Sequence, residues 1–190
     1  MSVEYVEPIK EVEKINAIKR NLKKQSARDY LLFVFGINTG IRVNQLLSLK
    51  VKDIYTGNEF KEFLYVKDDD KQSGEKAVYL NSNVRNAAKL YLGNRDFTED
   101  QYLFQSKKNP QPITRQQAYR IINQAGKEVG IPGKIGTHTL RKTFGYHAYR
   151  KGIAISILMD IYNHHSPAET LHYIGIDKNE KLLVKVDVNL

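Results

Sequence analysis

Residues 29–49 read DYLLFVFGINTGIRVNQLLSL, and this stretch indicates two helices that meet at a sharp corner. Its first half contains a continuous apolar run, so we expect a buried helix over Asp29–Asn38. Gly40 lies two residues after Asn38, and glycine just past a helix end is a common way for a helix to stop. A second, Leu-rich helix is expected over Val43–Leu49. Arg42 therefore lies at the corner beside a helix N-terminus, where an anion is favoured by the guanidinium and by the helix dipole.

Outside this stretch, apolar residues at helical spacing and recognisable caps predict six further helices. Thr114 opens a capping box that Gln117 closes, and Ser166 followed by Pro167 is an equally strong start. The expected spans are Pro8–Lys24, Asn83–Leu92 after a cap at Asn81 or Ser82, a helix after Thr114, His138–Arg150 capped by Thr137, Ala154–Tyr162, and a helix after Ser166 that carries Tyr173. The first of these should bury Ile9, Val12, Ile15, Ile18 and Leu22.

Two short strands are expected in the middle of the chain, over Glu62–Val66 and Lys76–Leu80. They flank the polar segment KDDDKQSGE, in which Gly74 supplies turn chemistry, so the pattern predicts a hairpin. The tail over Leu183–Val188 alternates apolar and charged residues and reads as a short terminal strand. No linker or repeat divides residues 1–190. The predicted fold is therefore one domain, mostly α with a small antiparallel β-sheet.

The charge of the chain points to an anionic partner. Lys and Arg number 30 against 21 Asp and Glu, which gives +9 and a pI near 9.5. Nucleic acid is the first candidate, although composition does not separate DNA from RNA or from a merely solvated basic surface. Cysteine is absent, which excludes disulfides and thiolate chemistry. We find neither a signal peptide nor an apolar run long enough to cross a membrane.

Two pairs of residues carry candidate chemistry. His138 and Arg141 are three residues apart, so on a helix they share a face that can bind an anionic oxygen. Taken alone, such a pair is more often a solvated helix face, and Arg42 alone is more often a surface arginine. His164 and His165 lie in a turn before the helix that carries Tyr173. No metal-binding spacing accompanies them, so we expect no metal and no cofactor.

The order of these elements resembles the catalytic domain of the tyrosine recombinases, the phage integrase family. An Arg in TGIRVNQLLSL is followed by a Lys in a two-stranded turn and by HTLR on a helix. A His in IYNHHS comes next, and a Tyr lies nine residues beyond it (173 − 164). The resemblance covers residues 27–174.

The resemblance implies a role for each matching residue. It assigns the catalytic set, which is Arg42, Lys71, His138, Arg141, His164 and Tyr173. Tyr173 would be the nucleophile and His138 the acceptor of its proton. The two arginines would clamp the scissile phosphate, His164 would donate to the same oxygens, and Lys71 would protonate the leaving 5′-oxygen.

The chain departs from the family pattern in three places. Gln45 stands where the family usually has an acid, and Asp68–Asp70 directly precede the hairpin lysine. Lys67 and Lys76 are alternatives to Lys71. The sequence before the last histidine is Tyr162-Asn163 rather than the usual Leu-Gly, which leaves His165 as a rival to His164.

The implied function is site-specific recombination of double-stranded DNA through a 3′-phosphotyrosyl intermediate, in the cytoplasm in association with the nucleoid. A DNA-binding or regulatory protein with the same fold, and relaxation of the type IB topoisomerase kind, are the alternatives. The resemblance also implies a tetramer on DNA, with residues 175–190 packing either on a neighbouring subunit or on their own domain. Fewer than thirty residues precede residue 27, so we expect the family's N-terminal DNA-clamping domain to be absent. Either the chain is a fragment of a longer integrase, or it belongs among the small recombinases that consist of little more than a catalytic domain.

Overall fold

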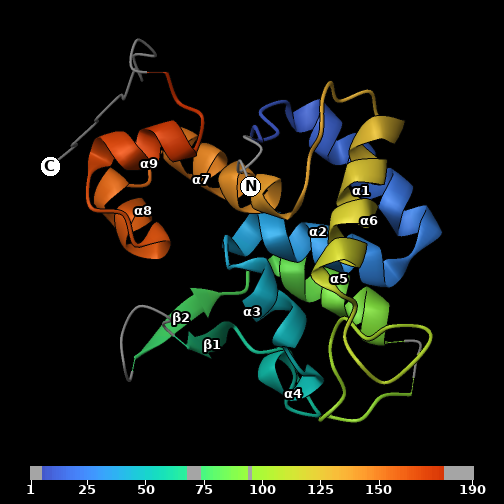
Figure 1. Ribbon diagram of the computed structural model, residues 1–190. Coiled ribbons are helices and arrows are strands. Elements are labelled where there is room, and N and C mark those ends of the chain that lie inside the picture. The colour runs from blue at the N-terminus through green and yellow to red at the C-terminus, as the bar shows by residue number, and fades with distance from the viewer. Residues whose placement is uncertain (1–5, 68–73, 94–95, 178–190) are drawn as a thin grey trace, which may run out of the picture.

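The computed structural model describes residues 6–67, 74–93 and 96–177. Over these ranges the chain is mostly helical and carries one two-stranded antiparallel sheet, which confirms the predicted fold class. Figure 1 shows the helices gathered around α2, with the hairpin to one side. The elements are α1 (Val12–Gln25), α2 (Ala27–Thr39), α3 (Val43–Ser48), α4 (Val51–Ile54), β1 (Phe63–Lys67), β2 (Glu75–Tyr79), α5 (Ser82–Leu92), α6 (Arg115–Glu128), α7 (Thr137–Arg150), α8 (Ile155–Tyr162) and α9 (Pro167–Tyr173).

Helix α2 forms the centre of the core, because every residue from Leu31 to Gly36 is buried. It packs against α1, α5, α6 and α7. Phe35 meets Phe104 edge to face, with ring centroids 6.3 Å apart. A helix buried on all sides must be apolar on all sides, which explains the uninterrupted apolar run in the sequence.

Two glycines of α2 and its C-terminus allow the close packing and the sharp turn that this helix requires. A Cβ at Gly36 would lie 2.6 Å from Leu140 Cδ1, so the missing side chain allows α7 to approach closely. Gly40 ends the helix at φ 65°, in the left-handed region, as the sequence predicts. The chain then turns sharply into α3, and Arg42 occupies its N-cap position.

The two strands form the predicted antiparallel hairpin, and in its register Leu64 pairs with Val78 and Phe63 pairs with Tyr79. Leu64 and Val66 point into the core, whereas Phe63 and Tyr65 are exposed. Residues 68–73, which include Asp68–Asp70 and Lys71, lie outside the described residues. The same holds for the terminal strand expected over residues 183–188.

Several predicted caps are confirmed. The Asn81 side chain accepts from the amide of Val84 at the start of α5. Thr114 and Gln117 form the reciprocal capping box of α6. The Ser166 side chain caps α9, with Pro167 as the first helical residue. None of the helices in the described ranges is long and apolar enough to cross a membrane.

Helix α1 differs from its prediction, because it starts at Val12 rather than at Pro8. Residues 6–10 instead have no regular secondary structure and lie against α7, where the Ile9 amide donates to Thr143 Oγ1 at 2.9 Å. Ile9 is buried in this way, but Val12 is 51% exposed and does not join the apolar face. Lys10 Nζ donates to Gly175 O at 2.7 Å, so this N-terminal segment also holds the chain just after α9.

The predicted cap of α7 is wrong by one residue. Gly136 occupies the N-cap position and Thr137 is already helical. The hydroxyl that stabilises this turn belongs to Thr139, whose Oγ1 accepts from the Gly136 amide at 3.1 Å. A Cβ at Gly136 would lie 2.7 Å from the Tyr119 ring, so close packing against α6 requires glycine there. The short helix α4 is not predicted by the sequence pattern either.

The contact between Gly36 and Leu140 can be tested by a double-mutant cycle. Gly36→Ala overpacks the α2–α7 crossing and should lower the free energy of unfolding by ~1–3 kcal/mol. Leu140→Ala opens a cavity and should cost ~2–5 kcal/mol. The smaller side chain at position 140 leaves room for the methyl group added at position 36. The loss in the free energy of unfolding of the double variant, measured in urea, should therefore be smaller than the sum of the two single losses by at least ~0.5 kcal/mol.

The buried Leu64 on β1 supplies the matched control for this cycle. Leu64→Ala combined with Gly36→Ala should give additive losses within ~0.5 kcal/mol. Additive losses for Gly36→Ala and Leu140→Ala as well would contradict the proposed close approach.

Candidate active site

Five of the six candidate residues line one cavity of about 270 Å³. They come from three regions of the chain: the start of α3, the first turns of α7, and the segment from α8 to α9. The five residues are Arg42, His138, Arg141, His164 and Tyr173. Folding therefore brings together side chains up to 131 positions apart (173 − 42). Lys71 lies outside the described residues.

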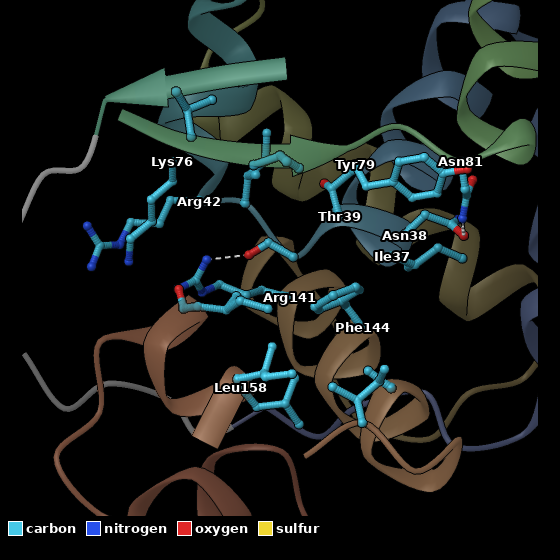
Figure 2. A pocket seen from close by; sticks show the side chains of 18 of the residues that line it. Ile37, Asn38, Thr39, Arg42, Lys76, Tyr79, Asn81, Arg141, Phe144 and Leu158 are labelled. Carbon is cyan, nitrogen blue, oxygen red and sulfur yellow. Dashed lines mark hydrogen bonds between the residues drawn. The ribbon is translucent and has the colours of Figure 1, made fainter. Parts of the chain in front are cut away.

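Arg141 is fixed by backbone carbonyl groups on two sides. Its Nη1 donates to Gly40 O, the residue that ends α2, and its Nη2 donates to Ile161 O in α8 at 3.0 Å. The guanidinium also lies 4.6 Å from the ring centroid of Tyr162. Figure 2 shows Arg141 reaching toward Gly40 O from α7, on the side where Arg42 projects. These bonds orient the guanidinium before any ligand binds.

Gln45 links Arg42 to the hairpin. Its Oε1 accepts from the Arg42 amide at 3.3 Å, and its Nε2 donates to Lys67 O at 2.9 Å. The second bond requires an amide, because a carboxylate has no N–H to donate to a carbonyl oxygen. This explains why glutamine suits the position where the family usually has an acid: here the side chain also ties down the end of β1, where the hairpin turn begins.

The two described lysines of the hairpin face a different space. Lys67 and Lys76 line a groove of about 930 Å³ that runs between the hairpin and helices α7 and α8 (Figure 2). Lys76 Nζ donates to Asp160 O at 2.8 Å, which connects β2 to α8. Arg42 and Arg141 line both the groove and the smaller cavity, so they form the boundary between the two.

His138 is in contact with a residue that the sequence did not single out. Arg115 Nη2 lies 3.1 Å from His138 Nε2, and Arg115 lines the same cavity. Partial desolvation and the positive charges of Arg115, Lys142 and Arg141 lower the pKa of His138 below 6.5. The imidazole is therefore neutral at pH 7. The capping box at Thr114 places Arg115 at a helix start, but nothing in the sequence links it to a histidine 23 positions away (138 − 115).

His164 is oriented by α9. Its Nδ1 lies 3.0 Å from Thr170 Oγ1, and the Thr170 hydroxyl donates to Ser166 O at 3.3 Å. With the hydroxyl proton directed at Ser166 O, Thr170 Oγ1 accepts the proton of Nδ1. Burial lowers the pKa of His164, and the nearby Glu169 opposes that shift. His165 is exposed, and it is not among the described residues that line the cavity.

Tyr173, the last residue of α9, is enclosed by aromatic and cationic groups. Its ring centroid lies 5.0 Å from that of Tyr162 and 5.1 Å from that of His164. The buried Lys142 places Nζ 5.1 Å from the same ring. Burial raises the pKa of Tyr173, while the charge of Arg141 and its hydrogen bond lower it in part. The phenol is therefore protonated at neutral pH and requires a base before it can attack.

Together these residues form a positively charged pocket with the hydroxyl of Tyr173 beside two guanidinium groups and two imidazoles. Two guanidinium groups bind a tetrahedral anion with permanent charge, and neutral imidazoles can accept or pass on a proton. Across residues 6–67, 74–93 and 96–177, no group of three His, Cys, Asp or Glu is placed to hold a metal ion.

Comparisons with known proteins show which family this chain resembles in sequence and in fold. A model of the phage integrase family matches residues 8–180. The probable integrase/recombinase YoeC of Bacillus subtilis is 41% identical over 174 residues, which cover 92% of each chain. The tyrosine recombinase XerA of Pyrococcus furiosus is 30% identical over 86% of this chain and 56% of its own length. The crystal structure of a XerA recombinase has a TM-score of 0.73 at 24% identity and covers 94% of this chain and 61% of its own. The chain thus spans most of YoeC but little more than half of XerA.

The role of Gln45 can be tested by Gln45→Glu. The carboxylate keeps the bond to the Arg42 amide but cannot donate to Lys67 O, so the end of β1 should open more often. Losing one such bond costs ~0.5–1.5 kcal/mol, which corresponds to roughly 2–13-fold faster amide hydrogen exchange in the hairpin. Gln116→Glu, an equal charge change at an exposed position on α6, is the control and should leave the hairpin amides unchanged. Equal exchange in both variants would refute the link.

The protonation of the two histidines can be measured by nitrogen-15 NMR of the protein without DNA. His138 and His164 should both titrate below the value near 6.5 that they show in the urea-unfolded chain. As pH falls below 6.5 the unfolded chain takes up these protons first, so the folded state loses stability in that range. A midpoint at or above that of the unfolded chain would contradict the assigned environment.

Proposed function

The chain belongs to the phage integrase family, and from this membership we propose that it cuts and rejoins double-stranded DNA at specific sites through a 3′-phosphotyrosyl intermediate. The observation that carries the proposal is the single cavity in which Tyr173 lies beside Arg42, Arg141 and two neutral histidines. Such a cavity supplies a nucleophile, charge stabilisation and proton acceptors at one point, as phosphodiester cleavage requires.

In the proposed reaction, a DNA phosphate occupies the space between Arg42 and Arg141. Tyr173 Oη attacks the phosphorus atom and gives its proton to His138, while the bond to the 5′-oxygen breaks. Lys71 is proposed as the acid that protonates this leaving oxygen. His164 is proposed as a further donor to the phosphate once its Nε2 takes up a proton, because in the neutral ring the Nδ1–H bonds to Thr170 and Nε2 holds a lone pair. The new phosphotyrosyl bond conserves the energy of the broken one, so a 5′-hydroxyl of another strand can later expel the tyrosine.

The orientation of Arg141 supports this assignment. Its two backbone acceptors hold the guanidinium in place before DNA arrives, so little reorganisation is needed when charge builds up on the phosphate. Removing one preorganised donor of this kind typically costs ~10²–10³ in rate. Permanent positive charge at this point performs the charge neutralisation that metal ions provide in many nucleases.

We also propose the assembly in which this reaction takes place. Residues 1–190 would act as one catalytic domain, as a tetramer on its DNA site and weakly associated without it. The tail over residues 175–190 would pack either on a neighbouring subunit or on its own domain. Because the proposed substrate is chromosomal or mobile DNA, the site of action would be the nucleoid in the cytoplasm. The net charge of +9 supports a DNA partner.

The test uses a nicked suicide duplex that carries the cognate site, because the nick traps the covalent product. The wild type should form a protein–DNA adduct that survives denaturation, and Tyr173→Phe should form none, because it lacks the oxygen that makes the bond. Tyr149→Phe makes the same change on α7, outside the cavity, and should retain wild-type adduct formation. Gel electrophoresis after heating in detergent measures the amount of adduct that each of the three proteins forms.

The remaining outcomes separate the alternatives. An adduct that persists in Tyr173→Phe means that another residue is the nucleophile. Binding without an adduct in the wild type indicates a regulatory DNA-binding protein. Relaxation of supercoiled DNA without a second DNA partner indicates a topoisomerase-like activity.

A further inference from the structure

The contact between Arg115 and His138 imposes a condition on the proposed base. Arginine has only donors, so the guanidinium N–H points at His138 Nε2, which lies 3.1 Å away and must carry a lone pair. A neutral imidazole with its lone pair on Nε2 carries its proton on Nδ1. It can therefore accept another proton only at Nε2, which is the atom that Arg115 occupies. In this arrangement His138 has no free position for the proton of Tyr173.

The position of the Arg115 side chain allows it to move away from His138. It is the first residue of α6, its side chain is exposed, and the bond to His138 is its one polar contact within the described part of the chain. A guanidinium binds a phosphate through two charge-assisted bonds, which are roughly twice as strong as a bond to a neutral acceptor. Since Arg115 lines the same cavity as Arg42 and Arg141, a bound DNA backbone brings phosphates within its neighbourhood.

We propose that Arg115 is a latch on the general base: it blocks His138 Nε2 in the DNA-free protein and moves to a backbone phosphate when DNA binds. This inference rests on the function proposed above. The released Nε2 then takes the proton of Tyr173 Oη as the oxygen–phosphorus bond forms and the bond to the 5′-oxygen breaks. The enzyme thereby couples the availability of its base to the presence of DNA.

Other charged and titratable groups face His138 from every side of the cavity. Arg115 approaches from α6, while Arg141 and Lys142 lie on α7 itself. The start of α3 contributes Arg42, and the segment from α8 to α9 contributes His164 and Tyr173. Partial burial and then these cations lower the pKa of His138, so at pH 7 the block on Nε2 is the hydrogen bond itself rather than a proton.

The first test measures the lone pair directly in the DNA-free protein. Diethyl pyrocarbonate modifies neutral imidazole nitrogens, so mass spectrometry can follow its reaction with His138 against the exposed His165 in the same molecule. Arg115→Gln should react faster at His138 than the wild type, and its His138 pKa by NMR should be higher because one positive charge is gone. Arg20→Gln removes an equal charge from an exposed position on α1 and should behave like the wild type at His138.

The second test measures the phosphate contact. Binding of a non-specific 20-base-pair duplex is titrated at several salt concentrations. Arg115→Gln should reduce the slope of log affinity against log salt by ~1, whereas Arg115→Lys, which keeps the charge, should preserve the slope. Circular dichroism melting establishes that each variant is folded before either measurement.

Two results overturn the latch. Equal modification of His138 in the wild type and Arg115→Gln means that Arg115 does not block the base, and an unchanged salt slope means that DNA does not draw it away. Neither measurement depends on cleavage. If the suicide duplex gives no adduct while both tests succeed, the proposed recombinase activity fails and the phosphate-sensitive contact stands.

Discussion

The site depends on how the Arg141 guanidinium is held. It bonds to Gly40 O at the end of α2 and to Ile161 O in α8, so one side chain joins the core helix to the segment that leads to Tyr173. Helix termini leave carbonyl groups without helical partners, and a guanidinium satisfies them while keeping its charge. The close α2–α7 crossing at Gly36 brings Arg141 within reach of these acceptors. The position of the Arg141 guanidinium in the site therefore depends on how closely α2 and α7 pack in the core.

Burial and four positively charged side chains determine the protonation states in the cavity. Arg42, Arg115, Arg141 and Lys142 lie around two histidines and a tyrosine, and the histidines are neutral because partial burial and positive neighbours disfavour another charge. Tyr173 keeps its proton because burial outweighs the attraction of Arg141 for a phenolate. The arginines and Lys142 thus make the cavity positively charged, while both histidines are neutral and Tyr173 is protonated. A phosphate would supply the missing negative charge and change the protonation balance of every group around it.

Local signals predicted much of the fold, since caps and apolar periodicity act within a few residues. Gly40, Thr114 and Ser166 end or begin helices as predicted. Prediction failed where a distant contact outweighed local preference. The α1 helix starts late because residues 6–10 pack across α7, and Gly136 caps α7 because Tyr119 leaves no room for a side chain there. Neither contact leaves a trace in the nearby sequence.

The sequence by itself determined the family, the helical fold with its hairpin, and the identity of the candidate residues, because the order and spacing of motifs are one-dimensional properties. Tertiary structure alone decided that five of these residues share one cavity, that His164 rather than His165 faces it, and that Arg115 joins them. It also gave Gln45 its role, through a bond to a strand 22 positions away. The physical reason is that hydrogen bonds and desolvation act over a few ångströms in space, whatever the separation along the chain.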